Sequence, residues 1–169
     1  MVNKILIIGS GAREHAIVRA LDRSPQKKEL YCLASNMNPG IAEICDELTV
    51  GRISDPDFVV NYAQETAATL AIIGPENPLE NGVADALWKL GVKTVGPKQK
   101  LARLETSKAF TRDLLKEYAI PGGPKYQIFD SMVGVAEFLK ELKENYVVKY
   151  DGLMGGKGVK VSGDHLHSH

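Results

Sequence analysis

The sequence predicts an α/β protein that begins with a doubly wound parallel sheet and continues into a smaller, partial α+β lobe. Over the first 97 residues, short aliphatic runs alternate with amphipathic segments of helical spacing, and this alternation occurs four times. The strand-like runs are apolar throughout, which is typical of parallel strands covered by helices on both faces. With 169 residues, the chain is long enough for one complete domain and a piece of another.

Each predicted strand in the first part is followed by a predicted helix. The first strand ends at Gly9, where a tight turn begins, and Ser35 to Gly40 form a loop at the end of the second strand. Asp55 followed by Pro56 is typical of a helix start, and Gly91 of a helix end. The predicted strands are residues 4–8, 29–34, 69–73 and 92–95, and the predicted helices are residues 13–21, 55–65, 79–90 and 98–118.

Two prolines around two glycines in Ile120–Pro124 predict a domain boundary. Beyond it the pattern predicts a strand at 125–129, a helix at 131–143, strands at 146–149 and 158–161, and a glycine-rich loop between these last two strands. The last residues have no apolar periodicity, and we expect them to be disordered. The predicted organisation is therefore an N-terminal domain (1–97), a linker helix (98–120), a partial lobe (121–163) and a tail (164–169).

The composition argues against nucleic acid and membranes as partners. Lys plus Arg number 21 and Asp plus Glu number 21, so the formal charge is zero and any anion site must be local. The N-terminal apolar run is too short to span a membrane and lacks the features of a signal peptide. Cys32 and Cys45 lie in apolar stretches and suit free thiols in a reducing compartment. We therefore expect a cytoplasmic protein that acts on small molecules.

The turn after the first strand, Gly9–His15, predicts a phosphate site. Small residues let the backbone approach a ligand, and a helix start offers amide N–H groups. A nicotinamide dinucleotide fold would have a third glycine at position 14 and an acidic residue at the end of the second strand. The sequence has Glu14 and Ser35 there. Without further evidence, an ordinary helix start with solvated Arg13 and Glu14 remains an alternative.

Two segments of the first domain resemble phosphoribosylamine–glycine ligases. Gly9–Ala16 resembles the family's glycine-rich opening with Arg-Glu-His-Ala, and Gly74–Leu79 with Gly82 is similar to the loop that meets the sugar-phosphate amine. The loop of residues 35–40 differs from the family's usual order, and none of its residues is assigned to the site. The alternative for the second segment is a proline-stiffened connection with a solvated carboxylate. The resemblance implies these contacts to the sugar-phosphate amine: Gly9, Gly11, Arg13, Glu14 and Glu76.

Two later segments resemble the segments that bind ATP in the same family and in its ATP-grasp relatives. Leu104–Phe110 resembles the Leu-Glu-x-Ser-Lys segment before the nucleotide site, and Val147–Val159 resembles the ATP-grasp phosphate loop. Lysines neutralise polyphosphate charge, and glycines let a loop close over it. A mobile surface loop with solvated lysines is the alternative. The implied ATP contacts are Lys108, Lys149, Gly155, Gly156, Lys157 and Gly158.

The resemblance implies a Rossmann-like pre-ATP-grasp domain followed by part of an ATP-grasp lobe, and a ligase of purine biosynthesis. Such a ligase joins glycine to 5-phosphoribosylamine with ATP and Mg²⁺, and gives glycinamide ribonucleotide, ADP and phosphate. Family members are longer, and we expect the Mg²⁺ ligands and the adenine pocket in their C-terminal part. We therefore expect no activity from this chain alone, name no catalytic residue and assign no metal site.

Three alternatives to this function remain. The chain could be a non-catalytic phosphoribosyl-binding module, or half of a split ligase that pairs with a separate C-terminal half. A different ATP-grasp ligase is the third alternative. It is less favoured because Arg13-Glu14-His15 occurs together with Gly74-Pro75-Glu76.

Overall fold

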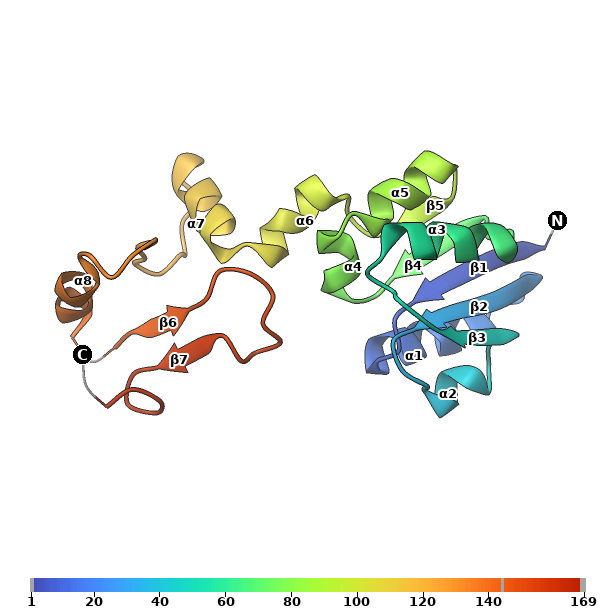
Figure 1. Ribbon diagram of the computed structural model, residues 1–169, viewed down its shortest axis with the longest axis horizontal. Coiled ribbons are helices and arrows are strands. Elements are labelled where there is room, and N and C mark those ends of the chain that lie inside the picture. The colour runs from blue at the N-terminus through green and yellow to red at the C-terminus, as the bar shows by residue number, and fades with distance from the viewer. Residues whose placement is uncertain (1, 144, 168–169) are drawn as a thin grey trace. The chain divides into compact units, whose positions relative to one another are not determined.

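The computed structural model describes residues 2–143 and 145–167, which form two structural units. A parallel sheet of five strands lies at the centre of the first unit (Figure 1). This unit extends to Ala102. Its spatial strand order is β3-β2-β1-β4-β5, so the direction of winding reverses between β1 and β4. The predicted doubly wound parallel sheet is confirmed. The strands are β1 (Asn3–Ile8), β2 (Lys28–Ala34), β3 (Glu47–Val50), β4 (Leu70–Ile73) and β5 (Lys93–Val95).

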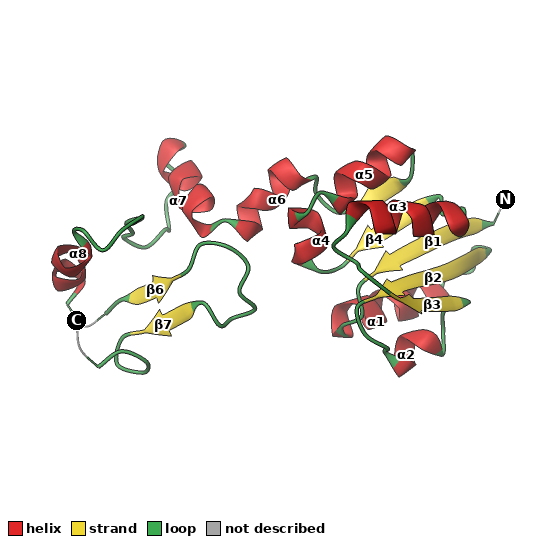
Figure 2. Ribbon diagram, in the orientation of Figure 1, coloured by secondary structure: helices red, strands yellow, loops and turns green. Residues whose placement is uncertain are grey.

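Helices cover both faces of this sheet (Figure 2). Helices α1 (Ala12–Asp22) and α2 (Pro39–Ala42) lie on one face, and α3 (Pro56–Glu65) and α5 (Val83–Leu90) lie on the other. Successive side chains of a strand point to opposite faces. Leu6 and Ile8 of β1 therefore join the core under α3 and α5, whereas Ile5 and Ile7 join the core under α1 and α2. This double burial explains why β1 is apolar throughout.

Two local predictions about helix ends are confirmed. Oδ1 of Asp55 accepts hydrogen bonds from the N–H groups of Asp57 (3.1 Å) and Phe58 (3.2 Å), and Pro56 occupies the first position of α3. Gly91 ends α5 in the left-handed conformation, with φ of +91°. These ends depend on local chemistry, which the sequence carries directly.

The structure corrects two features of the first unit. Strand β3 was not predicted, because its four residues lie at the edge of the sheet and are half-buried or exposed rather than continuously apolar. The predicted helix 79–90 is divided into α4 (Glu76–Glu80) and α5, because Gly82 adopts φ of +82° between them. A left-handed residue interrupts a right-handed helix.

The second unit begins at Arg103 and contains a two-stranded antiparallel sheet. Its elements are α7 (Lys108–Glu117), α8 (Val135–Leu142), β6 (Val147–Lys149) and β7 (Val159–Val161). Helix α6 (Gln99–Thr106) comes before α7, so the predicted helix 98–118 is interrupted at Ser107. The predicted strand 125–129 is wrong, because these residues form no regular structure.

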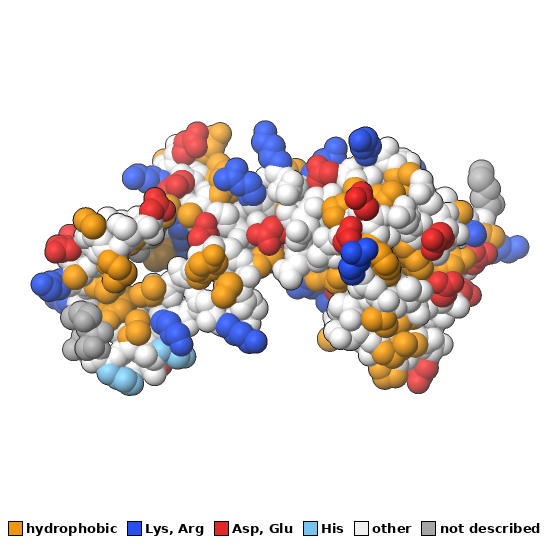
Figure 3. Space-filling model, viewed as in Figure 1, with side chains coloured by type: hydrophobic (Ala, Val, Ile, Leu, Met, Phe, Trp, Pro, Cys, Tyr) orange, Lys and Arg blue, Asp and Glu red, His pale blue; other side chains and the backbone are white. Residues whose placement is uncertain are grey.

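The second unit has little buried apolar surface. Among the described residues from Arg103 onward, only Thr106 and Tyr146 are buried. Apolar side chains gather on the visible face around α8 and the β6–β7 hairpin (Figure 3). In the segment predicted to be a disordered tail (164–169), the N–H of His165 donates to the carbonyl of Val161, and the carbonyl of Leu166 accepts from the N–H of Gly163. Residues 168–169 lie outside the described part.

Within the described residues, no helix has the length and apolar character needed to cross a membrane.

Candidate functional site

Three loops meet at the carboxyl edge of the parallel sheet, beside the point where the winding reverses. The turn after β1 contacts the loop after β2 through two polar contacts: the hydroxyls of Ser10 and Ser35 are 2.9 Å apart, and Nδ2 of Asn38 donates to the carbonyl of Ser10 at 2.9 Å. The loop after β4 approaches the same turn through Gly74. Ligands of doubly wound sheets bind at such a crevice.

Arg13 connects the two segments that the sequence assigns to the sugar-phosphate amine. Its Nη1 lies 3.0 Å from Oε1 of Glu76 and also donates to the carbonyl oxygen of Gly74. The ion pair is accessible, with side-chain exposures of 60% for Arg13 and 30% for Glu76. Arg13 and Glu76 are 63 residues apart in the sequence, so the fold places the two segments together.

The carboxyl of Glu76 is held in its charged form. The backbone N–H of Glu76 at the start of α4 is the largest cause of its lowered pKa, partial burial opposes this effect, and Arg13 lowers the pKa further. An ionised carboxylate accepts hydrogen bonds only. Glu76 can therefore accept them from hydroxyl or amine groups of a ligand.

Glu14 is buried, with 4% of its surface exposed. Its Oε2 accepts a hydrogen bond from the N–H of Gly11 at 2.5 Å. A Cβ added at Gly9 would lie 2.8 Å from Cδ of Glu14, and one added at Gly74 would overlap Oε1 of Glu14. Glu14 therefore fills the space beside two glycines and holds the turn together. A direct contact between Glu14 and a ligand stays a prediction, and its burial favours a positioning role.

The start of α1, which the sequence predicts to bind phosphate, has first-turn N–H groups that no helix carbonyl accepts. Gly11 precedes the helix as its N-cap, and the N–H of Gly11 donates a hydrogen bond to the carboxylate of Glu14. The first-turn N–H groups that follow have no carbonyl four residues earlier within the helix, and the helix dipole favours a negative charge there. On the next turn, the imidazole of His15 packs against Gly40, where an added Cβ would lie 2.6 Å from Cε1.

In the second unit, Lys108 lies at the start of α7 beside the residues that follow β6. Its Nζ donates to the carbonyl of Gly152 at 2.8 Å. Oδ1 of Asp151 accepts from the N–H groups of Lys108 (2.6 Å) and Ala109 (3.1 Å), and Oδ2 accepts from the hydroxyl of Ser107 (2.9 Å). The fold thus joins the third and fourth segments identified in the sequence.

The pKa of Asp151 is lowered. Partial burial is the largest single cause and opposes this shift, but the hydrogen bonds from Ala109, Ser107 and Lys108 together with the charge of Lys108 outweigh it. Asp151 is therefore ionised at neutral pH. Sequence reasoning missed this residue.

The glycine-rich loop is closed at its base and open at its tip. Tyr150 N–H donates to the carbonyl of Gly158 at 2.8 Å. Gly155 and Gly156 have φ of +53° and +79°, and a Cβ added at either would meet nothing within 4 Å. A Cβ at Gly158 would instead lie 2.8 Å from Met154. The side chains of Lys149 and Lys157, which flank this loop, are exposed.

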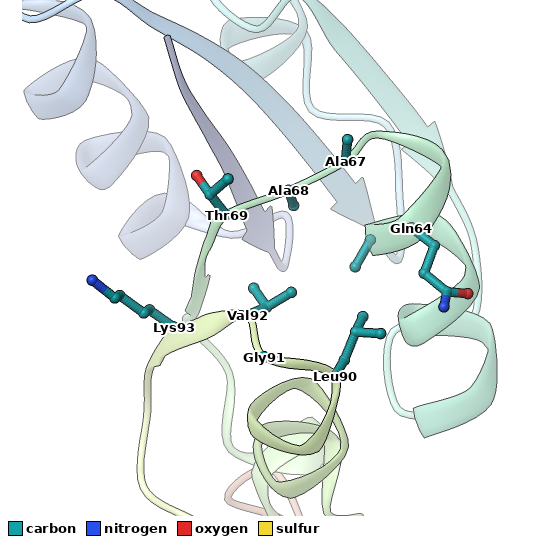
Figure 4. Close-up of a pocket in the computed structure, with 9 residues that line it drawn as sticks. Gln64, Ala67, Ala68, Thr69, Leu90, Gly91, Val92 and Lys93 are labelled. Carbon is teal, nitrogen blue, oxygen red and sulfur yellow. The ribbon is translucent and has the colours of Figure 1, made fainter. Parts of the chain in front are cut away.

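The described residues contain no group of three or more His, Cys, Asp or Glu side chains that could hold a metal ion. One open hollow of about 420 Å³ is lined by Gln64, Thr69, Lys93 and small or apolar residues (Figure 4). Thr69 and Lys93 come at the starts of β4 and β5. The hollow therefore lies at the amino edge of the sheet, away from Arg13 and Glu76.

Comparison with known families matches nearly the whole chain. The model of the phosphoribosylglycinamide synthetase N domain matches residues 3–105, and the model of the ATP-grasp (A) domain of the same family matches residues 106–168. The chain belongs to the phosphoribosylglycinamide synthetase family. Its Arg13–Glu76 pair lies in the region of the N domain, and Lys108, Asp151 and the glycine-rich loop lie in the region of the A domain.

Curated relatives of the synthetase family are named phosphoribosylamine–glycine ligase. The chain is 44% identical over 163 residues to the protein of Methanosarcina barkeri, 45% over 164 to that of Methanopyrus kandleri and 46% over 167 to that of Methanocaldococcus jannaschii. Each comparison covers 96% of this chain. The chain spans only 36–37% of the length of these relatives.

Solved structures of other families share the fold. The biotin carboxylase domain of 2-oxoglutarate carboxylase from Hydrogenobacter thermophilus, determined with ADP and magnesium, has a TM-score of 0.75 at 19% identity and covers 96% of this chain and 38% of that one. N5-carboxyaminoimidazole ribonucleotide synthetase from Thermotoga maritima has a TM-score of 0.69 at 17% identity, with coverages of 95% and 41%. At these identities the similarity concerns the fold alone.

Proposed function

We propose that this chain supplies the sugar-phosphate site and part of the ATP site of a phosphoribosylamine–glycine ligase of purine biosynthesis. The single observation that most supports the proposal is the ion pair of Arg13 and Glu76, which joins two family segments at the crevice of the sheet. A cation and an ionised carboxylate on neighbouring loops suit a ligand that carries both a phosphate and a hydroxylated, amine-bearing sugar.

On the sugar side, we assign the phosphate to the turn from Gly9 to Gly11 and the first turn of α1, where the helix dipole and the Arg13 guanidinium favour an anion. Glu76 accepts hydrogen bonds from the ribose hydroxyls or the amine. Glu14 stabilises the conformation of this turn, because its carboxylate is buried against Gly9 and Gly74.

On the ATP side, we assign phosphate contacts to Lys108, Lys149 and Lys157 and to the glycine-rich loop, Gly155, Gly156 and Gly158. The open tip of the loop leaves room for a polyphosphate, and the left-handed glycines allow it to change conformation. We assign no step to the metal here. We place the Mg²⁺ ligands in the part of the relatives that this chain does not match.

The proposed reaction has two steps. A carboxylate oxygen of glycine attacks the γ-phosphorus of ATP, which forms an acyl phosphate and releases ADP. The amine nitrogen of phosphoribosylamine then attacks the acyl carbon, the carbon–oxygen bond to phosphate breaks, and the amine loses a proton. In both steps the residues of this chain bind and orient reactants. No general base is assigned, and we propose that the chain needs a C-terminal part for ligation.

Calorimetry tests this proposal and its two main alternatives. Ribose 5-phosphate should bind the wild-type chain, and Arg13→Gln should weaken binding on the order of tenfold or more. Arg19→Gln, on the exposed side of the same helix, is the matched control and should bind normally. If ribose 5-phosphate binds and ATP does not, a phosphoribosyl-binding module is favoured. If the unmatched C-terminal part of the Methanocaldococcus jannaschii protein restores ligation, the chain acts as half of a split ligase.

A further inference from the structure

Asp151 connects the glycine-rich loop to α7 by more than one bond. Its two carboxylate oxygens accept three hydrogen bonds, from the N–H groups of Lys108 and Ala109 and from the hydroxyl of Ser107. The next residue, Gly152, accepts a further bond from Nζ of Lys108. Two successive loop residues are therefore tied to the backbone and the side chain of one lysine.

An ordinary helix cap would not need Asp151. Ser107 already caps α7, because its Oγ accepts from the N–H of Phe110 at 3.1 Å. Asp151 adds acceptors for the preceding two amides and a negative charge at the positive end of the helix dipole. This charge comes from a residue 44 positions away from Ser107, so it fixes tertiary structure as well as the helix end.

The same contacts set the position of the ammonium group of Lys108. Nζ has three donors, and the carbonyl of Gly152 takes one of them, so others remain for an incoming anion. The loop is held at its base by Asp151 and by the Tyr150–Gly158 hydrogen bond, while Gly155 and Gly156 at the tip have open space around them. A fixed base with a free tip lets the tip close while Lys108 stays in place.

We propose that Asp151 is a positioning residue that anchors the base of the glycine-rich loop to the first turn of α7 and thereby places Lys108 for polyphosphate. The use of this arrangement for ATP rests on the proposed function, whereas the anchoring itself does not. Asp151 acts through Lys108 and the loop backbone and makes no contact with the reacting atoms.

Amide hydrogen exchange in the 169-residue chain without nucleotide tests the anchoring. Asp151→Ala should raise the exchange rates of the Lys108 and Ala109 amides, and also those of the hydrogen-bonded loop amides of Tyr150 and Lys157, on the order of tenfold. Asp151→Asn keeps an acceptor oxygen and should give a smaller rise. Ser107→Ala removes the cap of α7 and one of the three hydrogen bonds to Asp151, so it should raise the exchange of the α7 amides and raise that of the loop less than Asp151→Ala does. Asp130→Ala, an exposed carboxylate of the same unit, is the control.

Titration of the same variants with ATP tests the consequence. Asp151→Ala should weaken ATP binding on the order of tenfold, with partial rescue in Asp151→Asn. The proposal is overturned if Asp151→Ala changes only α7 and leaves the exchange of the loop unaltered, or if the loop loosens while ATP affinity stays at the wild-type value. If the wild-type chain binds no ATP, the ATP part of the proposed function fails, and the exchange of loop residues alone decides whether Asp151 is an anchor.

Discussion

The carboxylate of Glu14 occupies the space in which side chains at positions 9 and 74 would begin. A buried carboxylate is costly unless it is hydrogen-bonded, and Gly11 N–H supplies a bond. Close packing against Glu14 therefore requires glycine at both positions, whether or not these residues also contact a ligand. At Gly9 the backbone adds a second reason, since φ is +123°.

Gly74→Ala should destabilise the first unit by about 2–3 kcal/mol, because its Cβ would overlap the carboxylate of Glu14. Urea unfolding monitored by circular dichroism measures this loss. In a Glu14→Ala background the space is free, and the same substitution should cost about 1 kcal/mol or less. Equal losses in the two backgrounds would show that Glu14 is not the cause.

The stability contributed by Glu76 should depend on pH. Its pKa is lower in the folded chain than in the unfolded chain, so the contribution is fully present above the unfolded value and is lost as the pH falls through the folded value. The group is partly exposed, so we expect less than about 1 kcal/mol. The free energies of unfolding of Glu76→Gln and wild type, measured with urea, should differ at about pH 7, and the difference should shrink as the pH falls below the usual glutamate value of about 4.3. Glu65→Gln, at an exposed position of α3, serves as the control, and a difference that stays constant with pH would contradict the assignment.

At the scale of single elements, the N-terminus of α3 shows how much a helix cap contributes to the free energy of unfolding. Asp55→Ala removes two hydrogen bonds to the first turn and should cost about 1 kcal/mol in the free energy of unfolding. Asp57→Ala, at an exposed position in the same turn, removes a carboxylate that makes no cap bond and should cost less than about 0.5 kcal/mol. Denaturant unfolding of both variants measures their free energies of unfolding. Equal losses in the two variants would show that the carboxylate charge near the helix dipole matters and the cap hydrogen bonds do not.

The elements that could be predicted are those whose signals are local or strongly apolar. Asp55 with Pro56 and the glycine at position 91 mark helix ends by their own chemistry, and β1 is buried on both faces. Strand β3 depends instead on pairing with β2, and its half-exposed residues carry no clear period. Residues 125–129 have strand-like composition but no partner strand among the described residues. Pairing partners are a property of the fold, which explains both errors.

The residues of the candidate site likewise include some that the sequence predicts and some that only the tertiary structure reveals. The glycine-rich turn and the Gly74–Glu76 segment could be found in the sequence, and the strand order brings them together at the switch point. The direct bond of Arg13 to Glu76 and the burial of Glu14 arise only from the tertiary structure, so the sequence does not reveal them. Asp151 was missed because its role depends on the first two residues of α7, which lie 43 and 42 residues earlier in the chain.

At the scale of the whole molecule, the two units differ in how much core they have. The residues of both large apolar clusters fall between Ile5 and Ala102, within the first unit. In the described part of the second unit, Thr106 and Tyr146 are the buried residues. Stability follows buried apolar area, so the second unit should be the less stable of the two.

Residue-resolved hydrogen exchange along a temperature series should therefore show protection lost first in α7, α8 and the β6–β7 hairpin, and later in the parallel sheet. A polypeptide of residues 1–102 should retain the later transition, because it contains both apolar clusters. One cooperative transition that includes both units, or an unfolded 1–102 polypeptide, would contradict this division.

The most direct test of the proposed sugar-phosphate site is an NMR titration of the ¹⁵N-labelled chain with ribose 5-phosphate. The amides of residues 9–15 should shift together with those of residues 74–76, and Arg13→Gln should move both sets of changes to ligand concentrations on the order of tenfold higher or more, while leaving the fold intact. If these amides do not move at millimolar ligand, or if shifts appear only elsewhere on the sheet, the turn after β1 does not bind the phosphate and the proposed function of the first unit is wrong.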